Sequence, residues 1–217
     1  RALETFVEAM AGDAGQVSMG LRVFGGAPHS CETDLVRPVG THAVADLIGD
    51  IDAIDPRNHA RTAIGAALEA AIDDLGAVSG ARSVLLVTDG EETCDGDPMA
   101  AVERLRDAFP ETRVDVVTFA LEGEIDRRPF QRWAAAGGGI YVDAADGTAL
   151  ASALRTAMGV RFDVVRDGKI VASGAAGGEP VALEPGRYEL VIDGNREPLR
   201  ITSGQTSRIE WAGSRGD

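Results

Sequence analysis

The stretch Ser83–Gly90, S-V-L-L-V-T-D-G, decides the fold of this 217-residue chain. Its core is an unbroken apolar run, which is typical of a parallel strand buried on both faces of a sheet. The Asp-Gly pair follows the run directly, so the carboxylate of Asp89 stands at the carboxyl end of the predicted strand. Because ligands of open α/β sheets bind at the carboxyl ends of strands, Asp89 is the first candidate for a functional residue.

Helices and strands alternate after this stretch. The predicted elements are a helix from Pro98, a strand over residues 114–121, a helix ending at Gly137, a strand over residues 140–142 and a helix over residues 147–157. Strands separated by helices of this length imply right-handed crossovers between parallel strands. The pattern therefore predicts an α/β fold with a Rossmann-like, doubly wound and mostly parallel sheet.

The segment before Ser83 has a similar mixed pattern. The predicted elements are an amphipathic helix from Leu3 to Met10, a strand over residues 17–23 closed by Gly25-Gly26, a short edge strand over residues 33–37 ended by Pro38 and Gly40, and a helix over residues 42–52. Pro56 and Asn58 then break the chain. The clearest helix begins at Thr62 and stops at Gly76, with apolar residues along one face.

The apolar period changes after Met158. Short alternating strands separated by turn pairs replace the helices. The predicted strand positions are residues 162–164, 170–171, 180–181, 188–192, 199–201 and 209–211. We therefore predict two domains, an α/β domain over residues 1–158 and a small all-β sandwich module over residues 159–217. A module of this size is near the lower limit for folding alone, so we expect it to dock against the first domain.

The composition restricts the partners. The chain carries 21 Lys and Arg against 35 Asp and Glu, a formal charge of −14. This charge argues against binding to nucleic acid, which requires clustered basic side chains. No apolar run approaches the roughly 20 residues that a membrane-spanning helix needs, so we predict no membrane span. The partners should be neutral, basic or joined through a cation.

Four motifs occur in a set order along the first domain. They are G-L-R-V-F-G at Gly20–Gly25, R-T-A-I-G-A-A-L at Arg61–Leu68, V-L-L-V-T-D-G-E-E-T-C-D-G-D at Val84–Asp97, and G-G-G-I-Y-V-D-A-A-D at Gly137–Asp146. Together they resemble von Willebrand factor type A domains, especially bacterial extracytoplasmic ones. In the small module, L-E-P-G-R-Y-E-L at Leu183–Leu190 resembles the L-x-P-G-x-Y strand of transthyretin-like or immunoglobulin-like bacterial modules.

The resemblance implies a metal site. In this family a divalent cation is held by a D-x-S-x-S loop, a threonine and an aspartate, which Thr62 and Asp89 match here. Hydroxyl and carboxylate oxygens suit a hard cation such as Mg²⁺, or alternatively Ca²⁺ or Mn²⁺. Each residue also has a simpler interpretation. Thr62 could cap its helix, which stabilises by roughly 1 kcal/mol, and Asp89 could serve only to form a turn before Gly90.

One part of the family pattern is missing. No D-x-S-x-S sequence occurs in the chain, and the strand that carries it would precede Arg1. That strand is central in the family sheet, and without it the neighbouring strands would expose unpaired backbone groups. We therefore expect an upstream N-terminal segment to pack in the sheet. Whether the metal site is intact depends on that segment.

The resemblance places the loops of Cys31 and Cys94 on the same face, so they can form a disulfide, which implies an oxidising, extracytoplasmic compartment, periplasmic or secreted. The alternative is two free thiols in a cytosolic protein. Glu91, Glu92, Asp95 and Asp97 form a predicted solvated rim that concentrates cations.

Two further groups of side chains receive no ligand role. The histidines His29, His42 and His59 lack the spacing of zinc ligands. We interpret Asp50, Asp52 and Asp55 as a solvated helix end.

These observations favour a binding module in which the cation coordinates an Asp or Glu of a protein partner. A structural subunit of an extracytoplasmic assembly, with a vestigial metal site, is the alternative. An enzyme using Asp89 as a phosphotransfer nucleophile is disfavoured, because no Gly-rich phosphate loop follows the first strand. We therefore predict no enzymatic activity.

Overall fold

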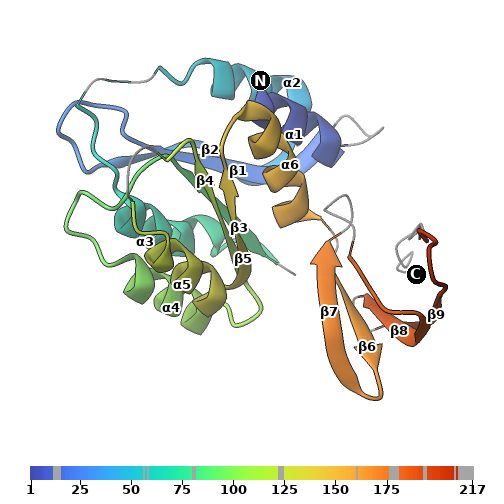
Figure 1. Ribbon diagram of the computed structural model, residues 1–217. Coiled ribbons are helices and arrows are strands. Elements are labelled where there is room, and N and C mark those ends of the chain that lie inside the picture. The colour runs from blue at the N-terminus through green and yellow to red at the C-terminus, as the bar shows by residue number, and fades with distance from the viewer. Residues whose placement is uncertain are drawn as a thin grey trace. The chain divides into compact units, whose positions relative to one another are not determined.

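A computed structural model describes residues 1–11, 16–55, 57, 59–79, 82–121, 125–159, 161–175, 181–192, 195–207 and 209. The chain divides into two compact units, Arg1–Met158 and Gly159–Asp217 (Figure 1). The elements of the first unit are α1 (Ala2–Ala11), β1 (Gln16–Phe24), β2 (Thr33–Ala43), α2 (Val44–Asp52), α3 (Ile64–Leu75), β3 (Ser83–Thr88), α4 (Pro98–Ala108), β4 (Arg113–Phe119), α5 (Arg128–Ala136), β5 (Gly138–Ala144) and α6 (Gly147–Met158). The predicted alternation of helices and strands is confirmed.

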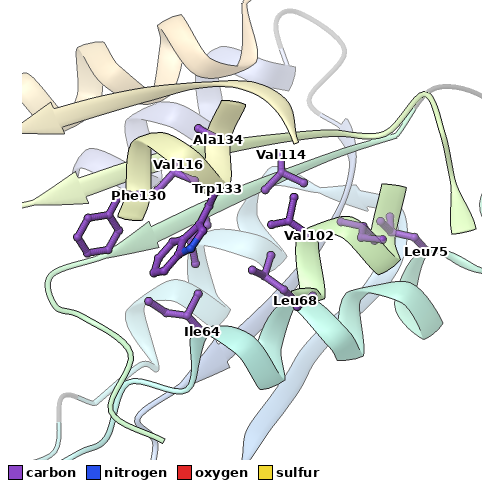
Figure 2. Packing of buried hydrophobic residues seen from close by; sticks show 12 residues of the cluster. Ile64, Leu68, Leu75, Val102, Val114, Val116, Phe130, Trp133 and Ala134 are labelled. Carbon is purple, nitrogen blue, oxygen red and sulfur yellow. The ribbon is translucent and has the colours of Figure 1, made fainter. Parts of the chain in front are cut away.

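A parallel sheet of three strands, in the order β3-β4-β5, forms the centre of this unit. Helices cover both of its faces (Figure 1). On one face the buried side chains of α3, α4 and α5 pack together, with Leu68, Val102, Phe130 and Trp133 among them (Figure 2). On the other face α1, α2 and α6 contribute a second cluster around Leu154. The doubly wound arrangement predicted from the sequence is therefore present.

Strands β1 and β2 form a separate antiparallel pair. The prediction that Pro38 and Gly40 end the second of these strands is wrong, because β2 continues to Ala43. The register shifts around Gly20, where Met19 pairs with Gly40 but Leu21 pairs with Arg37. This irregularity accommodates the proline, which lacks an N–H donor and is tolerated at a bulge or on an edge strand.

The second unit contains one antiparallel sheet in the order β7-β6-β8-β9. Its strands are β6 (Arg161–Arg166), β7 (Lys169–Ala175), β8 (Gly186–Ile192) and β9 (Asn195–Ile201). The predicted Asp167-Gly168 turn joins β6 to β7, with φ angles of 53° and 75° that suit a type I′ hairpin turn. Tyr188 lies in the core of the sheet and its hydroxyl donates to the Glu184 carbonyl at 2.8 Å.

A sandwich requires a second layer, which the described residues of this unit do not contain. The predicted strand positions at Pro180 and Trp211 lie outside the described residues. The sandwich architecture, the transthyretin-like or immunoglobulin-like resemblance and the docking on the first unit therefore stay predictions. Among the helices of the described ranges, none has the length and apolar character that crossing a membrane would require.

Candidate functional site

Two loops meet at the carboxyl end of β3. One follows β3 and contains Asp89, and the other precedes α3 and contains Thr62. A Cβ atom placed on Gly90 would lie 3.5 Å from Thr62 Oγ1, which shows how closely the loops approach. A reciprocal pair of hydrogen bonds joins them, because the Thr62 amide donates to Thr93 Oγ1 at 2.7 Å and the Thr93 amide donates to the Thr62 carbonyl at 2.9 Å. The structure thus brings the two predicted ligand residues to one place.

Thr62 does not cap its helix. The helix begins at Ile64 and its N-cap residue is Ala63, so Thr62 lies one residue further out than a cap would. Among the described residues, Thr62 Oγ1 has no hydrogen-bond partner, and the exposed carboxylate of Asp89 has neither a hydrogen bond nor an ion pair. The capping interpretation of Thr62 is therefore wrong, and both side chains present oxygens that the fold does not use.

The first turn of α3 is held instead by Glu92. Its carboxylate accepts from the Gly65 amide at 2.7 Å and from the Cys94 amide at 2.7 Å. A negative charge at a helix N-terminus also interacts favourably with the helix dipole. Glu92 was predicted to belong to the solvated rim, but the structure gives it a bridging role between α3 and the loop after β3. Sequence spacing gave no signal for this role, because residues 65 and 92 meet only in the fold.

Replacing Glu92 should therefore destabilise the first unit. We expect Glu92→Ala to cost about 1–3 kcal/mol of unfolding free energy, since two backbone N–H groups lose a charged acceptor. Glu92→Gln should cost less, because the amide oxygen can still accept one of the two bonds. The matched control is Glu91→Ala at the exposed neighbouring position, with an expected change within about 0.5 kcal/mol. Urea unfolding followed by circular dichroism measures all three, and equal losses at positions 91 and 92 would contradict the bridging role.

The other acidic residues of the predicted rim differ among themselves. Asp97 caps α4, because its carboxylate accepts from the Ala100 amide at 3.0 Å. Glu91 and Asp95 are exposed, and Asp95 has a φ of 56°, in the left-handed region. Asp97 thus stabilises the first turn of α4, while Glu91 and Asp95 are exposed, as predicted.

The disulfide between Cys31 and Cys94 is confirmed, with a Cα–Cα distance of 5.6 Å. It joins the loop after β1 to the loop after β3. Nearby, Pro28 and Ala60 form an isolated antiparallel bridge. The loop after β1 is therefore tied to both loops that carry the candidate ligands.

The histidines have structural contacts. The rings of His29 and His59 stack with centroids 5.6 Å apart, and the His29 amide donates to the His59 carbonyl at 2.9 Å. A ring nitrogen of His42 lies 2.8 Å from the Pro38 carbonyl oxygen.

One member of the predicted solvated helix end is an exception. Asp50 accepts two hydrogen bonds from Arg37, at 2.6 and 2.9 Å. These bonds hold the pKa of the Asp50 carboxyl below its usual value. This carboxylate therefore ties α2 to β2 and is not simply solvated.

A polar row crosses the sheet at the same edge. Thr88, Thr118 and Asp143 lie side by side in the registers of β3, β4 and β5. The buried Thr118 hydroxyl lies 2.9 Å from both the Tyr141 hydroxyl and the Asp143 carboxylate, and Arg127 pairs with Asp143 at 2.5 Å. Burial raises the pKa of the Tyr141 hydroxyl above its ordinary value. Asp143 therefore has structural partners, in contrast to Asp89.

A hard divalent cation fits the donor chemistry of Thr62 and Asp89, which offer a hydroxyl and a carboxylate. Two oxygens fill only part of an octahedral shell. Within the described residues no group of three or more His, Cys, Asp or Glu side chains is placed to hold a metal. Further ligands would therefore have to come from water or from a segment such as the D-x-S-x-S loop that the resemblance implies.

These features define a doubly wound α/β domain with a candidate oxygen-ligand site at the carboxyl ends of its strands. The family model described as von Willebrand factor type A domain matches residues 1–156. The chain therefore belongs to the von Willebrand factor type A domain family, and the resemblance seen in the four motifs is confirmed.

The chain is also similar to a curated protein and to solved structures. A stretch of 65 residues is 42% identical to the uncharacterized protein YwmD of Bacillus subtilis (strain 168), covering 30% of this chain and 29% of that protein. The chain thus matches less than a third of this curated relative. Among solved structures, an aerotolerance-related membrane protein from Bacteroides fragilis is 20% identical with a TM-score of 0.55, covering 71% of this chain and 83% of its own.

A second solved structure carries a metal. Proximal thread matrix protein 1 from the mussel byssus, described with a zinc-occupied MIDAS motif, is 18% identical with a TM-score of 0.53, covering 71% of this chain and 40% of its own. At these identities the two structures establish a shared fold.

Proposed function

We propose that the first unit is a metal-dependent protein-binding module and not an enzyme. A divalent cation, Mg²⁺ or alternatively Ca²⁺ or Mn²⁺, would be held by Thr62, Asp89 and the serines of a D-x-S-x-S loop. An Asp or Glu of a protein partner would complete the coordination shell. The observation that carries this proposal is a pair of oxygen ligands in two adjoining loops, for which the described part of the chain provides no hydrogen-bond partner, in a domain of this family.

The charge of the chain supports the cation as the means of recognition. A protein of formal charge −14 repels an acidic partner, but a bound divalent cation reverses the local sign. The exposed Glu91 and Asp95 near the site would raise the local concentration of cations. The polar neighbours Thr93 and Glu92 bind backbone groups, so they would keep the two ligand loops in place whether or not a cation is bound.

The proposal predicts the effect of removing one ligand. In the chain carrying its D-x-S-x-S segment, Asp89→Asn should weaken Mn²⁺ binding at least about 10-fold, because even residues outside the first coordination shell change metal affinity by roughly 10–100-fold. Thr62→Val should also weaken binding, by less, because it removes a neutral ligand. Electron paramagnetic resonance of free Mn²⁺ measures the affinity directly.

The matched control is Asp95→Asn, which removes the same charge from an exposed side chain in the same loop. It should lower Mn²⁺ affinity no more than about twofold, an outcome that separates coordination from general electrostatic attraction. Equal losses for Asp89→Asn and Asp95→Asn would contradict the site. If the unsubstituted protein bound no Mn²⁺, the structural-subunit alternative would replace the binding module.

We also propose that the protein works outside the cytoplasm of a bacterium. The Cys31–Cys94 disulfide supports this location, because stable disulfides form in oxidising compartments. The membrane-protein description of the Bacteroides fragilis structure agrees with it. Mass spectrometry of non-reduced protein isolated from its native compartment is the test, and two free thiols would contradict the location.

A further inference from the structure

Histidines from two separate loops come together in the first unit. His29 lies in the loop after β1, and His59 lies three residues before Thr62 in the loop that precedes α3. Both residues are exposed, and their rings stack with centroids 5.6 Å apart and planes 17° apart. The fold therefore unites two imidazoles that are far apart in the sequence, which is why zinc-ligand spacing did not reveal them.

The backbone holds this pair together. The His29 amide donates to the His59 carbonyl at 2.9 Å. The neighbouring residues Pro28 and Ala60 form an isolated antiparallel bridge. Two residues after His29, the disulfide joins the same loop to the loop after β3. Because these links position the two loops, the rings stay close to each other without depending on their own weak contact.

Both histidines have a left-handed backbone, with φ angles of 59° for His29 and 57° for His59. Residues with a side chain adopt this conformation rarely, and it persists only where surrounding contacts maintain it. Such residues concentrate at ligand-binding and active sites. Two of them, hydrogen-bonded to each other and both carrying a metal-binding side chain, indicate a ligand site at this junction of loops.

The chemistry of the pair favours a transition-metal ion. Imidazole nitrogens suit borderline ions such as Zn²⁺, whereas hard cations prefer oxygen ligands. On a tetrahedral zinc ion with Zn–N bonds of about 2.1 Å, two imidazole rings have their centroids about 5 Å apart, close to the separation of the stacked pair. Because the planes are nearly parallel, each exposed ring must turn about its Cβ–Cγ bond to direct a nitrogen at a shared ion. This torsion has a broad range in histidine.

We propose that His29 and His59 bind one Zn²⁺ ion, which links the loop after β1 to the loop that carries Thr62. No thiolate competes for the ion, because both cysteines of the chain are in the disulfide. Within the described residues no group of three or more His, Cys, Asp or Glu is placed to hold a metal, so the ion takes water at its remaining positions. The site uses nitrogen ligands and does not rest on the proposed function.

Zinc titration of the whole chain, followed by NMR, tests the site. Excess Mg²⁺ is present to occupy oxygen ligands. One equivalent of Zn²⁺ should shift the ring nitrogen resonances of His29 and His59 together. The resonances of His42, whose ring lies against the Pro38 carbonyl, should not move. A shift of only one ring of the pair, or equal shifts of all three histidines, would overturn the proposal.

Substitution of each histidine gives an independent measurement. His29→Asn and His59→Asn each remove one ligand, and asparagine is among the residues that tolerate a left-handed backbone. Each should weaken Zn²⁺ binding at least about 10-fold, since even residues behind the ligands change metal affinity by roughly 10–100-fold. The matched control His42→Asn should change it by less than about twofold. Competition with a chromophoric chelator measures the affinity, and equal effects of all three substitutions would contradict the site.

Asp89→Asn separates this site from the candidate oxygen-ligand site. In excess Mg²⁺ it should leave the affinity for Zn²⁺ unchanged, and the two histidine variants should leave Mn²⁺ binding unchanged. If Asp89→Asn abolished zinc binding while His29→Asn and His59→Asn did not, zinc would occupy the oxygen-ligand site and the proposal would be wrong. The failure of one site is therefore distinguishable from the failure of the other.

Discussion

Loss of the Cys31–Cys94 disulfide is expected to lower the free energy of unfolding by about 4 kcal/mol. The two cysteines are 63 positions apart, and loop-entropy models assign a value near this to a loop of that length. Since domains are stable by only about 5–15 kcal/mol, the loss is a large fraction of the total. The double variant Cys31→Ser/Cys94→Ser, unfolded in urea beside the unsubstituted protein, measures it.

Chemical reduction of the disulfide provides the control for this prediction. Reduction should destabilise the unsubstituted protein by the same amount as the double substitution and should not change the double variant further. A loss below about 1 kcal/mol would show that the cysteine loops are already close together in the unfolded chain, because the entropic gain would then be absent.

Reduction of the disulfide should lower the free energy of unfolding but change the geometry of the candidate metal site only slightly. The loop after β3 is held by Glu92, whose carboxylate binds the Gly65 and Cys94 amides, and by the reciprocal bonds between Thr62 and Thr93. None of these bonds needs the disulfide. We therefore expect the disulfide to stabilise the whole unit. It should influence the geometry of Thr62 and Asp89 only weakly, although Cys94 lies in the same loop as Asp89.

The central strand and its neighbours could be predicted from the sequence because their signals are local. The apolar run of residues 83–88 coincides with β3, and Pro98 begins α4 as expected. The prediction for Pro38 is wrong because a local rule ends a strand at proline, whereas β2 bulges there, with residues 38 and 39 opposite Gly20 of β1. The predicted order of helices and strands is confirmed. The predicted end of β2 is wrong, because pairing with β1 decides where that strand ends.

The candidate site could likewise be predicted only where its signals are local or come from the family resemblance. Asp89 follows from its place at the end of a buried strand, and Thr62 came from the family resemblance. The function of Glu92 as the acceptor for the first turn of α3 was not predictable, because capping rules search within one helix and this acceptor lies 27 positions away. The polar row of Thr118 and Asp143 was missed for a related reason, since strand register is set by the sheet.

Asp115 shows how a buried charge is tolerated in this fold. It lies in the middle of β4 with a side chain that is 0% exposed. Its carboxylate accepts from Arg113 Nε at 2.6 Å and from the Ile140 amide at 2.9 Å. The β4–β5 ladder is irregular between Val114 and Val116. The Ile140 amide, which the ladder does not pair regularly, donates to the Asp115 carboxylate instead. Arg113 also donates to the Ala157 carbonyl of α6 at 2.8 Å.

Asp115→Ala is therefore expected to destabilise the first unit by about 3–5 kcal/mol, because it leaves the Arg113 charge and the Ile140 amide without their acceptor. Asp115→Asn should cost less, about 1–3 kcal/mol, since the amide oxygen can still accept from Ile140. The matched control is Asp126→Ala, which breaks an exposed ion pair with Arg128 and should cost less than about 1 kcal/mol.

The double variant Arg113→Met/Asp115→Leu separates the contribution of the Arg113 charge from that of the Ile140 amide. If the loss of the Arg113 ion pair causes most of the destabilisation, the double variant should be more stable than Asp115→Ala, because no charge then remains without its ion-pair partner. If the Ile140 amide causes most of it, the double variant should be as unstable as Asp115→Ala, since both lack an acceptor for that donor. Urea unfolding of the four variants at pH 7 distinguishes these cases, and a loss of less than about 1 kcal/mol for Asp115→Ala would show that neither bond contributes much to holding β4 against β5.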